Sequence, residues 1–474
     1  MTEILERING IVWGVPALLG ILGIGIYLTL RTSFVQLQWL PRALRDFLRQ
    51  FRPAKKDDGV SPFRALCTAL AATVGTGNLA GVAGAIAIGG PGAIFWMWIS
   101  AILGMMTKFA EATLAVRYRE KNQNGEWVGG PMYMIKNGMG PQWRPLALVY
   151  CFFGVVAAFG VGNATQVNTV IGGINQAVTA LGGTETTFGN LLMGIGLAVL
   201  ICGILLGGLS KIGLMAERLV PVASVCYLLL GAGVLIIQGE HIHQAFTSIF
   251  AGAFSPEAVT GGMVGSMFIA LRIGVSRGVF TNEAGMGTAG IAHAAARVEH
   301  PCRQGLMGIM EVFLDTIVIC TMTALVILVS GVEIPYGQDV GIILTAQAFS
   351  SVYGGWVSIL IAAALCCFAI ATVLGWGLYG ARCAQFLFGD GVWKKFVFLQ
   401  GGAVILGAVL KTGTVWLLSE TVNGLMAIPN LIALLALSPE LCRLVREYKR
   451  DFSFSARCAI IRKKTGRAGN EITG

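Results

Sequence analysis

Long apolar stretches separated by short polar ones run through almost the whole chain of 474 residues. A helix that crosses a membrane needs about 20 predominantly apolar residues. On that criterion the pattern predicts about eleven transmembrane helices, namely 10–30, 64–86, 92–115, 147–180, 189–208, 214–238, 264–296, 305–330, 351–381, 396–411 and 414–437. Counts of ten or twelve stay open, because the fourth, seventh and ninth stretches are long. The sequence therefore predicts an all-α membrane protein.

Two of these apolar stretches are interrupted by polar and glycine residues. The first interruption is 71–78, inside the apolar run 66–88, and the second is 274–283, in the run that starts near Met263. A broken helix leaves backbone amides and carbonyls that lipid cannot satisfy, so such breaks survive where they line a polar cavity. Paired breaks at matching places in two halves are the sequence signal of a secondary transporter's binding site.

Composition supports a membrane protein and excludes a string of soluble domains. Hydrophobic residues make up 55% of the chain and charged residues only 12%, against about 25% charged residues in soluble domains. The net charge of +10 resides mostly in loops, where basic residues set membrane orientation, so we expect no nucleic-acid partner. The 11 cysteines form no CxxC or Cys/His metal pattern, and we interpret them as reduced apolar fillers.

The distribution of Lys and Arg predicts how the chain is oriented. Segments 31–63, 116–146 and the tail after Leu437 are basic, whereas four other connections contain no Lys or Arg: 87–91, 181–188, 239–263 and 331–350. These two kinds of connection alternate correctly only with an odd number of spans. The positive-inside rule then predicts an external N-terminus and a cytoplasmic C-terminus.

The first span has no counterpart, and the other ten divide into five and five. We predict an N-terminal transmembrane helix with a cytoplasmic connector at 1–63, a first repeat at 64–238, a second repeat at 264–437, and a basic cytoplasmic tail at 438–474. Each repeat begins with an interrupted helix, the first entering from the cytoplasm and the second from outside, which defines an inverted repeat. Within the connector, 39–51 is either an amphipathic surface helix or a simple link.

The first interruption combines Gly75 and Gly77 with small and hydroxyl residues. Glycine lets the backbone leave helical geometry. The freed amides of Gly75, Thr76 and Gly77 could then face an anion, helped by the positive end of the half-helix that follows. Freed carbonyls from Ala71 to Val74 could coordinate a hard cation, and Asn78 could add an oxygen. The alternative is a glycine-packed helix crossing without a ligand.

Ionisable residues accompany the second interruption. Arg272, Arg277 and Glu283 lie near membrane depth, where such groups are costly and usually functional. Arg277 and Glu283 could pair as a structural bridge or gate, or could contact substrate. Phe280 is either a pocket wall or ordinary core.

Other polar or large residues at depth are further candidates. Trp376 lies between two glycines and is either a pocket wall or a packing wedge. Lys108 and Glu111 are one turn apart near the end of a span, and we interpret them as an interfacial pair. Gln166, Glu311 and Asp315 also lie at membrane depth. The chain contains no HExxH, no P-loop and no credible catalytic Ser/His or Cys/His set, so we predict neither an enzyme nor an ATP-driven pump.

Several long motifs resemble those of the alanine/glycine:cation symporter family. They are SPFRAL at 61–66, TALAATVGTGN at 68–78, GGPGA at 89–93, GGPMY at 129–133, GVSRGVFTNEAG at 274–285 and TVLGW at 372–376. The resemblance covers most of the chain. It implies a core of the leucine-transporter type, with a five-plus-five inverted repeat and one extra N-terminal helix.

The resemblance also implies sodium-coupled uptake of alanine or glycine, with no organic cofactor. Amides of Thr76 and Gly77 would hold the substrate carboxylate, while Thr73, Asn78 and the second break, with Gly274 and Asn282, would hold the ammonium group. The break at Gly75 would form part of the same site, and Gln166, Phe280 and Trp376 would restrict its size.

The related fold also implies a sodium site. Carbonyl groups of Ala71, Val74 and Phe368 with the hydroxyl of Thr372 would bind the ion, and Ala371 stands where the fold often has a hydroxyl. The implied partners are alanine or glycine, sodium and the lipid bilayer of a bacterial inner membrane, and the oligomeric state is unknown. Proton coupling through Glu283, Glu311 or Asp315, and a non-coupled channel or sensor, stay as alternatives.

Overall fold

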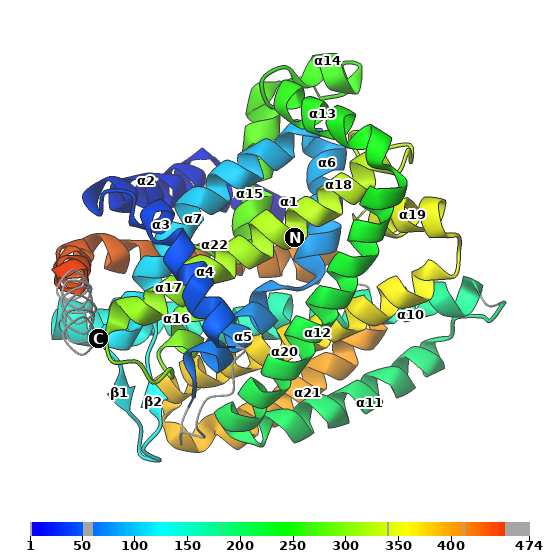
Figure 1. Ribbon diagram of the computed structural model, residues 1–474. Coiled ribbons are helices and arrows are strands. Elements are labelled where there is room, and N and C mark those ends of the chain that lie inside the picture. Colours follow the sequence, from blue (N-terminus) through cyan, green and yellow to red (C-terminus); the bar gives the residue numbers. More distant parts are fainter. Residues whose placement is uncertain are drawn as a thin grey trace, which may run out of the picture.

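The computed structural model describes residues 2–50, 60–180, 182–264, 266–338, 341–410 and 413–450, and these are mostly helical (Figure 1). The first half contains α1 (Thr2–Val12), α2 (Val15–Arg31), α3 (Val35–Gln38), α4 (Leu40–Arg49), α5 (Pro62–Thr73), η1 (Gly77–Gly81), α6 (Val82–Gly89), α7 (Gly92–Arg117), β1 (Glu120–Lys121), β2 (Trp127–Val128), α8 (Pro131–Met134), η2 (Ile135–Met139), η3 (Pro141–Trp143), α9 (Arg144–Phe159), η4 (Gly160–Ala164), α10 (Thr165–Ala180), α11 (Thr187–Leu205) and α12 (Gly208–Ile237).

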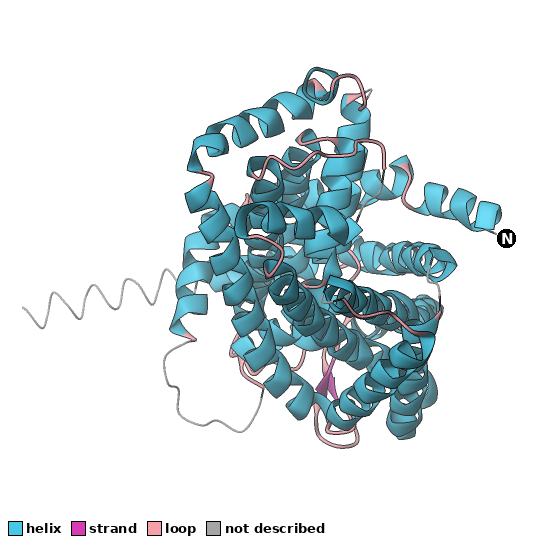
Figure 2. Cartoon of the chain, turned by 90° about the vertical axis from the view of Figure 1, so that its right-hand side faces the viewer, coloured by secondary structure: helices cyan, strands magenta, loops and turns pink. Residues whose placement is uncertain are grey.

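The second half is also mostly helical. It contains η5 (Gly239–His241), α13 (Ile242–Phe254), α14 (Pro256–Thr260), α15 (Met267–Asn282), α16 (Thr288–His293), α17 (Pro301–Val312), η6 (Phe313–Cys320), α18 (Thr321–Val329), α19 (Gly341–Tyr353), α20 (Val357–Phe388), η7 (Asp390–Val392), α21 (Trp393–Val409) and α22 (Gly413–Ala436). A further helix, Ser438–Arg450, follows α22. The N-terminal helix projects from the body of the molecule (Figure 2).

By length and composition, eight helices of the described chain could cross a membrane, or up to ten if each bent pair is one span. This confirms the predicted all-α membrane fold, but it does not confirm the count of eleven. The difference includes the predicted span 264–296, because α15 has only 16 residues and carries Arg272 and Arg277. The predicted connections 239–263 and 331–350 are partly helical, as α13 and α19, and residues 51–59 and 451–474 of the basic segments lie outside the described residues.

A serine caps the N-terminus of each of the two broken helices. The Ser61 hydroxyl accepts a hydrogen bond from the Arg64 amide, and Pro62 occupies the first turn of α5. The Ser266 hydroxyl accepts from the Ile269 amide at the start of α15. Each serine satisfies one of the amides that a helix N-terminus leaves without an acceptor. The capping residues therefore fix where each broken helix begins.

The first break lies where the sequence predicts it. Helix α5 ends at Thr73, Val74 is extended with ψ of 96°, and the chain resumes as the π-helical turn η1 before α6. The segments Pro62–Thr73 and Gly77–Gly89 are bent by 55° relative to each other. The interruption 71–78 is thus a true helix break and not only a glycine-packed crossing.

The second break lies further along the chain than predicted. Helix α15 continues unbroken through Asn282, and the backbone leaves helical geometry at Glu283, Gly285 and Gly287, with φ of +54°, +98° and +78°. The glycines earlier in α15 allow close packing against α7, because a Cβ on Gly274 would overlap the Ala93 carbonyl of that helix. Close helix packing of this kind is a common use of glycine in membranes.

The two broken helices run in opposite directions. In Figure 1, α6 lies above α5, whereas α16 lies below α15. This opposite sense is what an inverted repeat requires, although the repeat boundaries 64–238 and 264–437 stay a prediction.

Two basic segments contact the helix that follows α22. Arg42 donates to the Tyr448 hydroxyl at 2.9 Å, and Arg117 forms an ion pair with Glu440 at 2.9 Å. Two of the segments without Lys or Arg also contact each other, because the Gly337 amide donates to the Ala87 carbonyl at 2.9 Å. The side of the membrane on which each segment lies stays a prediction.

Candidate functional site: the two helix breaks

Gly75 is the most tightly enclosed residue of the first break. Its amide donates to Asn78 Oδ1 at 2.9 Å. A Cβ placed on Gly75 would lie 2.6 Å from Thr372 Oγ1 and 3.6 Å from Gln166 Oε1. The first break is therefore in direct contact with both α20 and α10, and position 75 has no room for a side chain.

The hydrogen bonds of the first break show which of the predicted anion-binding amides already have a partner. The Gly75 amide already donates to Asn78 and is not free to bind an anion, contrary to expectation. The amides of Thr76 and Gly77 begin the helical segment that follows, where a helix offers its own amides no acceptor. The Thr76 hydroxyl donates to Gln166 Oε1 at 3.1 Å, whereas the Thr73 hydroxyl bonds back to carbonyls of its own helix.

The residues proposed for sodium gather where α5 meets α20. In a continuous helix the Gly75 amide would donate to the Ala71 carbonyl, so its bond to Asn78 releases that carbonyl. Thr372 Oγ1, which lies against Gly75, donates to the Phe368 carbonyl at 3.0 Å. Carbonyl and hydroxyl oxygens suit a hard cation. Val74 and Ala371 are buried in the same region, but Ala371 has no side-chain oxygen to offer.

A hydrogen-bonded chain connects the two breaks. Asn78 Nδ2 donates to Asp315 Oδ1 at 2.8 Å, and the Thr316 hydroxyl donates to Asp315 Oδ2 at 2.8 Å. The same hydroxyl accepts from Asn282 Nδ2 at 3.1 Å, and Asn282 Oδ1 accepts from the Ala284 amide. The π-helical segment η6 thus bridges the first break to the end of α15.

Glu283 has different partners from the predicted one. Trp376 Nε1 donates to Glu283 Oε1 at 2.9 Å, and the Thr288 hydroxyl donates to Oε2 at 2.6 Å. The indole of Trp376 packs directly on Gly162, where any Cβ would overlap it. Trp376 is therefore a buried wedge that ties α20 to the second break, and the predicted bridge between Arg277 and Glu283 is replaced by these contacts.

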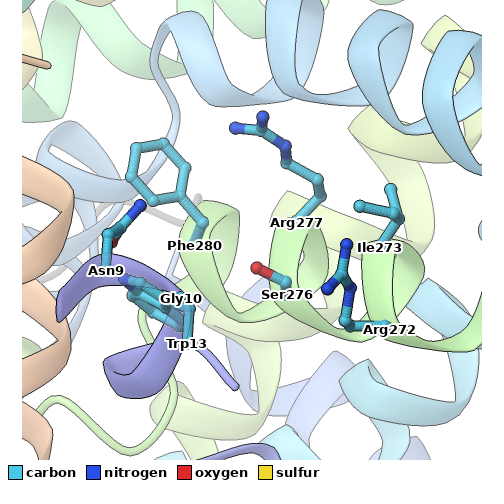
Figure 3. Close-up of a pocket in the computed structure, with 8 residues that line it drawn as sticks. All are labelled: Asn9, Gly10, Trp13, Arg272, Ile273, Ser276, Arg277 and Phe280. Atoms are coloured by element: carbon cyan, nitrogen blue, oxygen red, sulfur yellow. The ribbon is translucent and has the colours of Figure 1, made fainter. Parts of the chain in front are cut away.

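Two predicted site residues line a pocket beside α1, and a third packs against α7. Figure 3 shows Phe280 and Arg277 at a pocket of about 200 Å³ formed by α1 and α15, whose lining residues are Asn9, Gly10, Trp13, Arg272, Ile273, Ser276, Arg277 and Phe280. Gly274 packs against Ala93 and Trp96 of α7. These positions follow from the continuity of α15, which turns its middle residues toward α1 and α7 instead of into a break.

A buried ionic cluster beside the second break was predicted wrongly as an interfacial pair. Lys108 Nζ bonds Glu311 Oε1 at 2.9 Å, with both side chains 0% exposed. His293 Nε2 contacts Glu311 Oε2 at 2.9 Å, and Gln304 Nε2 contacts His293 Nδ1 at 2.7 Å. The sequence signal was the presence of ionisable residues within apolar spans, but it did not reveal that partners lie 203 positions apart.

Glu111 binds the backbone of the second break. Its Oε1 accepts from the amides of Gly285 and Gly287 at 2.9 and 3.1 Å and from Asn430 Nδ2 at 2.8 Å. A carboxylate of α7 and an amide of α22 therefore hold the irregular backbone of the second break. Neither Asn430 nor His293 was predicted from the sequence.

Two opposed broken helices that meet at buried polar groups define the class of secondary active transporters. The chain matches the sodium:alanine symporter family over residues 1–457, and it belongs to that family. It is 43% identical over 446 residues to the sodium/alanine symporter AgcS of Methanococcus maripaludis, covering 92% of this chain and 94% of AgcS.

Two further comparisons bear on substrate and fold. The chain is 37% identical over 462 residues to the probable sodium/glutamine symporter GlnT of Bacillus subtilis, covering 95% of this chain and 92% of GlnT. Its fold is similar to the crystal structure of MhsT in complex with L-phenylalanine, with a TM-score of 0.56 at 14% identity, over 82% of this chain and 99% of MhsT.

The family decides between the classes that the sequence left open. The chain is a multi-pass membrane protein and a sodium-coupled amino-acid symporter, not an enzyme, a channel or a sensor. The predicted resemblance and the leucine-transporter type of core are confirmed.

Proposed function

We propose that this symporter imports alanine or glycine together with sodium by alternating access. The observation that carries the proposal is the narrowness of the first break, where Gly75 leaves no room for even a methyl group beside Thr372 and Gln166. A substrate with a short side chain fits such a site, whereas a larger one needs the surrounding helices to move apart. The relative AgcS, named for alanine, supports the same substrate class.

The first break would bind the amino-acid backbone of the substrate. The amides of Thr76 and Gly77 would hold the carboxylate, helped by the positive end of the half-helix that follows. Thr73 and Asn282 would face the ammonium group, and Asn78 would fix the break by holding the Gly75 amide. Gln166, bonded to Thr76, and Trp376 would limit the size of the side chain.

Sodium would bind between α5 and α20. The Ala71, Val74 and Phe368 carbonyls and the Thr372 hydroxyl would supply oxygen ligands, and Ala371 would contribute only backbone. Binding there would join the first break to α20, which gives sodium a direct influence on how the substrate site is ordered. Proton coupling is the second candidate, because the carboxylates of Asp315 and Glu283 are buried beside the two breaks.

Transport would require the two broken helices to separate at their cytoplasmic ends. Those ends are joined here, since the Arg297 amide donates to the Val60 carbonyl at 2.9 Å, and Arg64 also ties the start of α5 to Glu217 of α12 at 2.8 Å. We place these contacts on the cytoplasmic side of a bacterial inner membrane, with the N-terminus outside and the C-terminus inside, because the positive-inside rule favours that orientation.

Reconstitution into liposomes tests the proposal. We would measure uptake of labelled alanine under an imposed sodium gradient and, separately, under a proton gradient, with unlabelled glycine, glutamine and phenylalanine as competitors. We expect accumulation with sodium alone, inhibited by glycine but not by phenylalanine. Uptake driven only by protons would remove the sodium site, and stronger competition by glutamine would overturn the small-substrate proposal. The Gly75→Leu variant, which blocks the first break, is the negative control.

A further inference from the structure

Asn430 and Glu111 meet at the second break with a fixed orientation. Asn430 Nδ2 donates both to Glu111 Oε1 and to the Gly285 carbonyl, each at 2.8 Å. Because both neighbours are acceptors, the nitrogen of the amide has to face them. The other atom of the amide, Oδ1, is therefore assigned without ambiguity.

The remaining two oxygens of this pair have no hydrogen-bond partner among the described residues. They are Glu111 Oε2 and Asn430 Oδ1, on side chains that are 1% and 0% exposed. If Glu111 is ionised, both atoms are acceptors, and leaving a buried acceptor unpaired costs about 1–3 kcal/mol for each. The pair therefore lacks one donor, and the same donor could satisfy both atoms.

We propose that Glu111 is a proton-binding site of this symporter, with the proton on Oε2 and Asn430 Oδ1 as its acceptor. The observed bond from Asn430 Nδ2 to Glu111 Oε1 is one half of a paired acid–amide contact, and the proton supplies the other half. Glu111 would act in the transport machinery and not in substrate recognition, and the transport measurement of its role rests on the proposed uptake of alanine.

The charges around Glu111 favour the added proton. The groups that face it are Lys108 on its own helix, Glu283 at the second break, Glu311 on α17, His293 on α16, and the buried hydroxyls of Tyr150 on α9 and Tyr379 on α20. His293 Nε2 contacts Glu311 Oε2, and Gln304 Nε2 contacts its Nδ1, so the ring faces Glu311 and not Glu111.

Ionised Glu111, Glu283 and Glu311 would place three negative charges around the ammonium group of Lys108, in a region closed to water. Burial of unpaired charge is strongly unfavourable. A proton on Glu111 reduces this excess of negative charge. Glu111 is the suitable carboxylate, because Glu311 already pairs with Lys108 and both oxygens of Glu283 already accept hydrogen bonds.

The site would connect proton binding to the shape of the second break. The same carboxyl group accepts from the Gly285 and Gly287 amides, which have left-handed backbone conformations. Loss of the proton would put two acceptors against each other at the Asn430 contact and would weaken the attachment of the break to α22. High pH should therefore loosen the arrangement seen here.

Infrared difference spectroscopy of the protein in nanodiscs tests the protonation directly. We expect a band from a buried protonated carboxyl group that is lost in Glu111→Gln, retained in Glu283→Gln and Asp315→Asn, and shifted in Asn430→Leu, which removes the acceptor. A band that survives in Glu111→Gln, or is lost only in one of the other carboxylate variants, overturns the assignment.

A transport measurement tests the consequence. Gln at position 111 can accept the three N–H donors and donate to Asn430, so Glu111→Gln imitates the protonated state. We expect sodium-driven alanine uptake by the wild-type protein to fall as the pH is raised, and that fall to be lost in Glu111→Gln. Identical pH profiles would contradict the proposal. If the wild-type protein transports another amino acid instead, the proposed substrate is wrong, and the infrared result still decides the proton site.

Discussion

Asn78 joins the first helix break to Asp315, a residue 237 positions away. Its Oδ1 accepts from the Gly75 amide at 2.9 Å, and its Nδ2 donates to Asp315 Oδ1 at 2.8 Å. One side chain thus satisfies a backbone group released by the break and fixes a buried carboxyl group on η6. The break is consequently held by a partner outside its own helix, which a continuous membrane helix does not need.

Replacing Asn78 by Ala should abolish uptake and destabilise the protein. The change leaves the Gly75 amide and the Asp315 carboxyl group without this partner, at a cost of about 1–3 kcal/mol for each buried group. Sodium-driven uptake in liposomes and thermal unfolding in detergent measure the two effects. Asn124→Ala, at an exposed loop position, is the matched control. Normal uptake by Asn78→Ala would show that the bridge is dispensable.

Ala should be far less tolerated at Gly75 than at Gly77. A Cβ at position 75 would lie 2.6 Å from Thr372 Oγ1, whereas a Cβ at position 77 would make an ordinary contact of 3.6 Å with Thr281. We expect Gly75→Ala to lose uptake through displacement of Thr372, and Gly77→Ala to retain most of it, because its amide is preserved. Initial rates as a function of sodium concentration distinguish the two variants, and equal loss in both would contradict this account.

Gly162→Ala should inactivate the transporter by displacing Trp376. The glycine in η4 lies directly under the indole, so an added methyl group would overlap Trp376 and strain its bond to Glu283. Gly172→Ala in α10 is the control, because a Cβ there meets no heavy atom within 4 Å, and Ala in a helix is more favourable than Gly by about 1 kcal/mol. Uptake and tryptophan fluorescence would report activity and indole environment, and an active Gly162→Ala protein with unchanged fluorescence would refute the packing argument.

The first break could be predicted from the sequence because its signal is local. Within an apolar run, Gly75, Thr76, Gly77 and Asn78 follow one another, and both glycine and Asn disfavour a continuous helix. The second break was misplaced because Gly274 and Gly278 are also glycines in an apolar run, yet they serve packing against α7. Glycine alone does not separate the two uses.

The ionic cluster could not be paired from the sequence. Lys108 and Glu111 are neighbours on one helix face, which suggested a local contact. In the structure Lys108 binds Glu311 and Glu111 binds the second break, through contacts between helices that only the tertiary arrangement determines. The register of a continuous α15 directs Phe280 and Arg277 to the pocket beside α1, which the sequence pattern does not reveal, and their roles in transport stay predictions.

The buried pair of Lys108 and Glu311 should be much less tolerant of a single change than of a double one. Lys108→Met removes the partner of a fully buried carboxylate, which costs about 3–5 kcal/mol, whereas replacing both members of such a pair is often close to neutral. We therefore expect a large fall in thermal stability in Lys108→Met and a partial recovery in the double variant with Glu311→Gln, whose amide can still meet His293. Lys136→Met is the control at the exposed pair with Glu120, where the loss should be below about 1 kcal/mol. If the double variant is no more stable than Lys108→Met, Lys108 stabilises the cluster through more than its ion pair with Glu311. Neutralising Glu311 would then not compensate for the loss of the lysine.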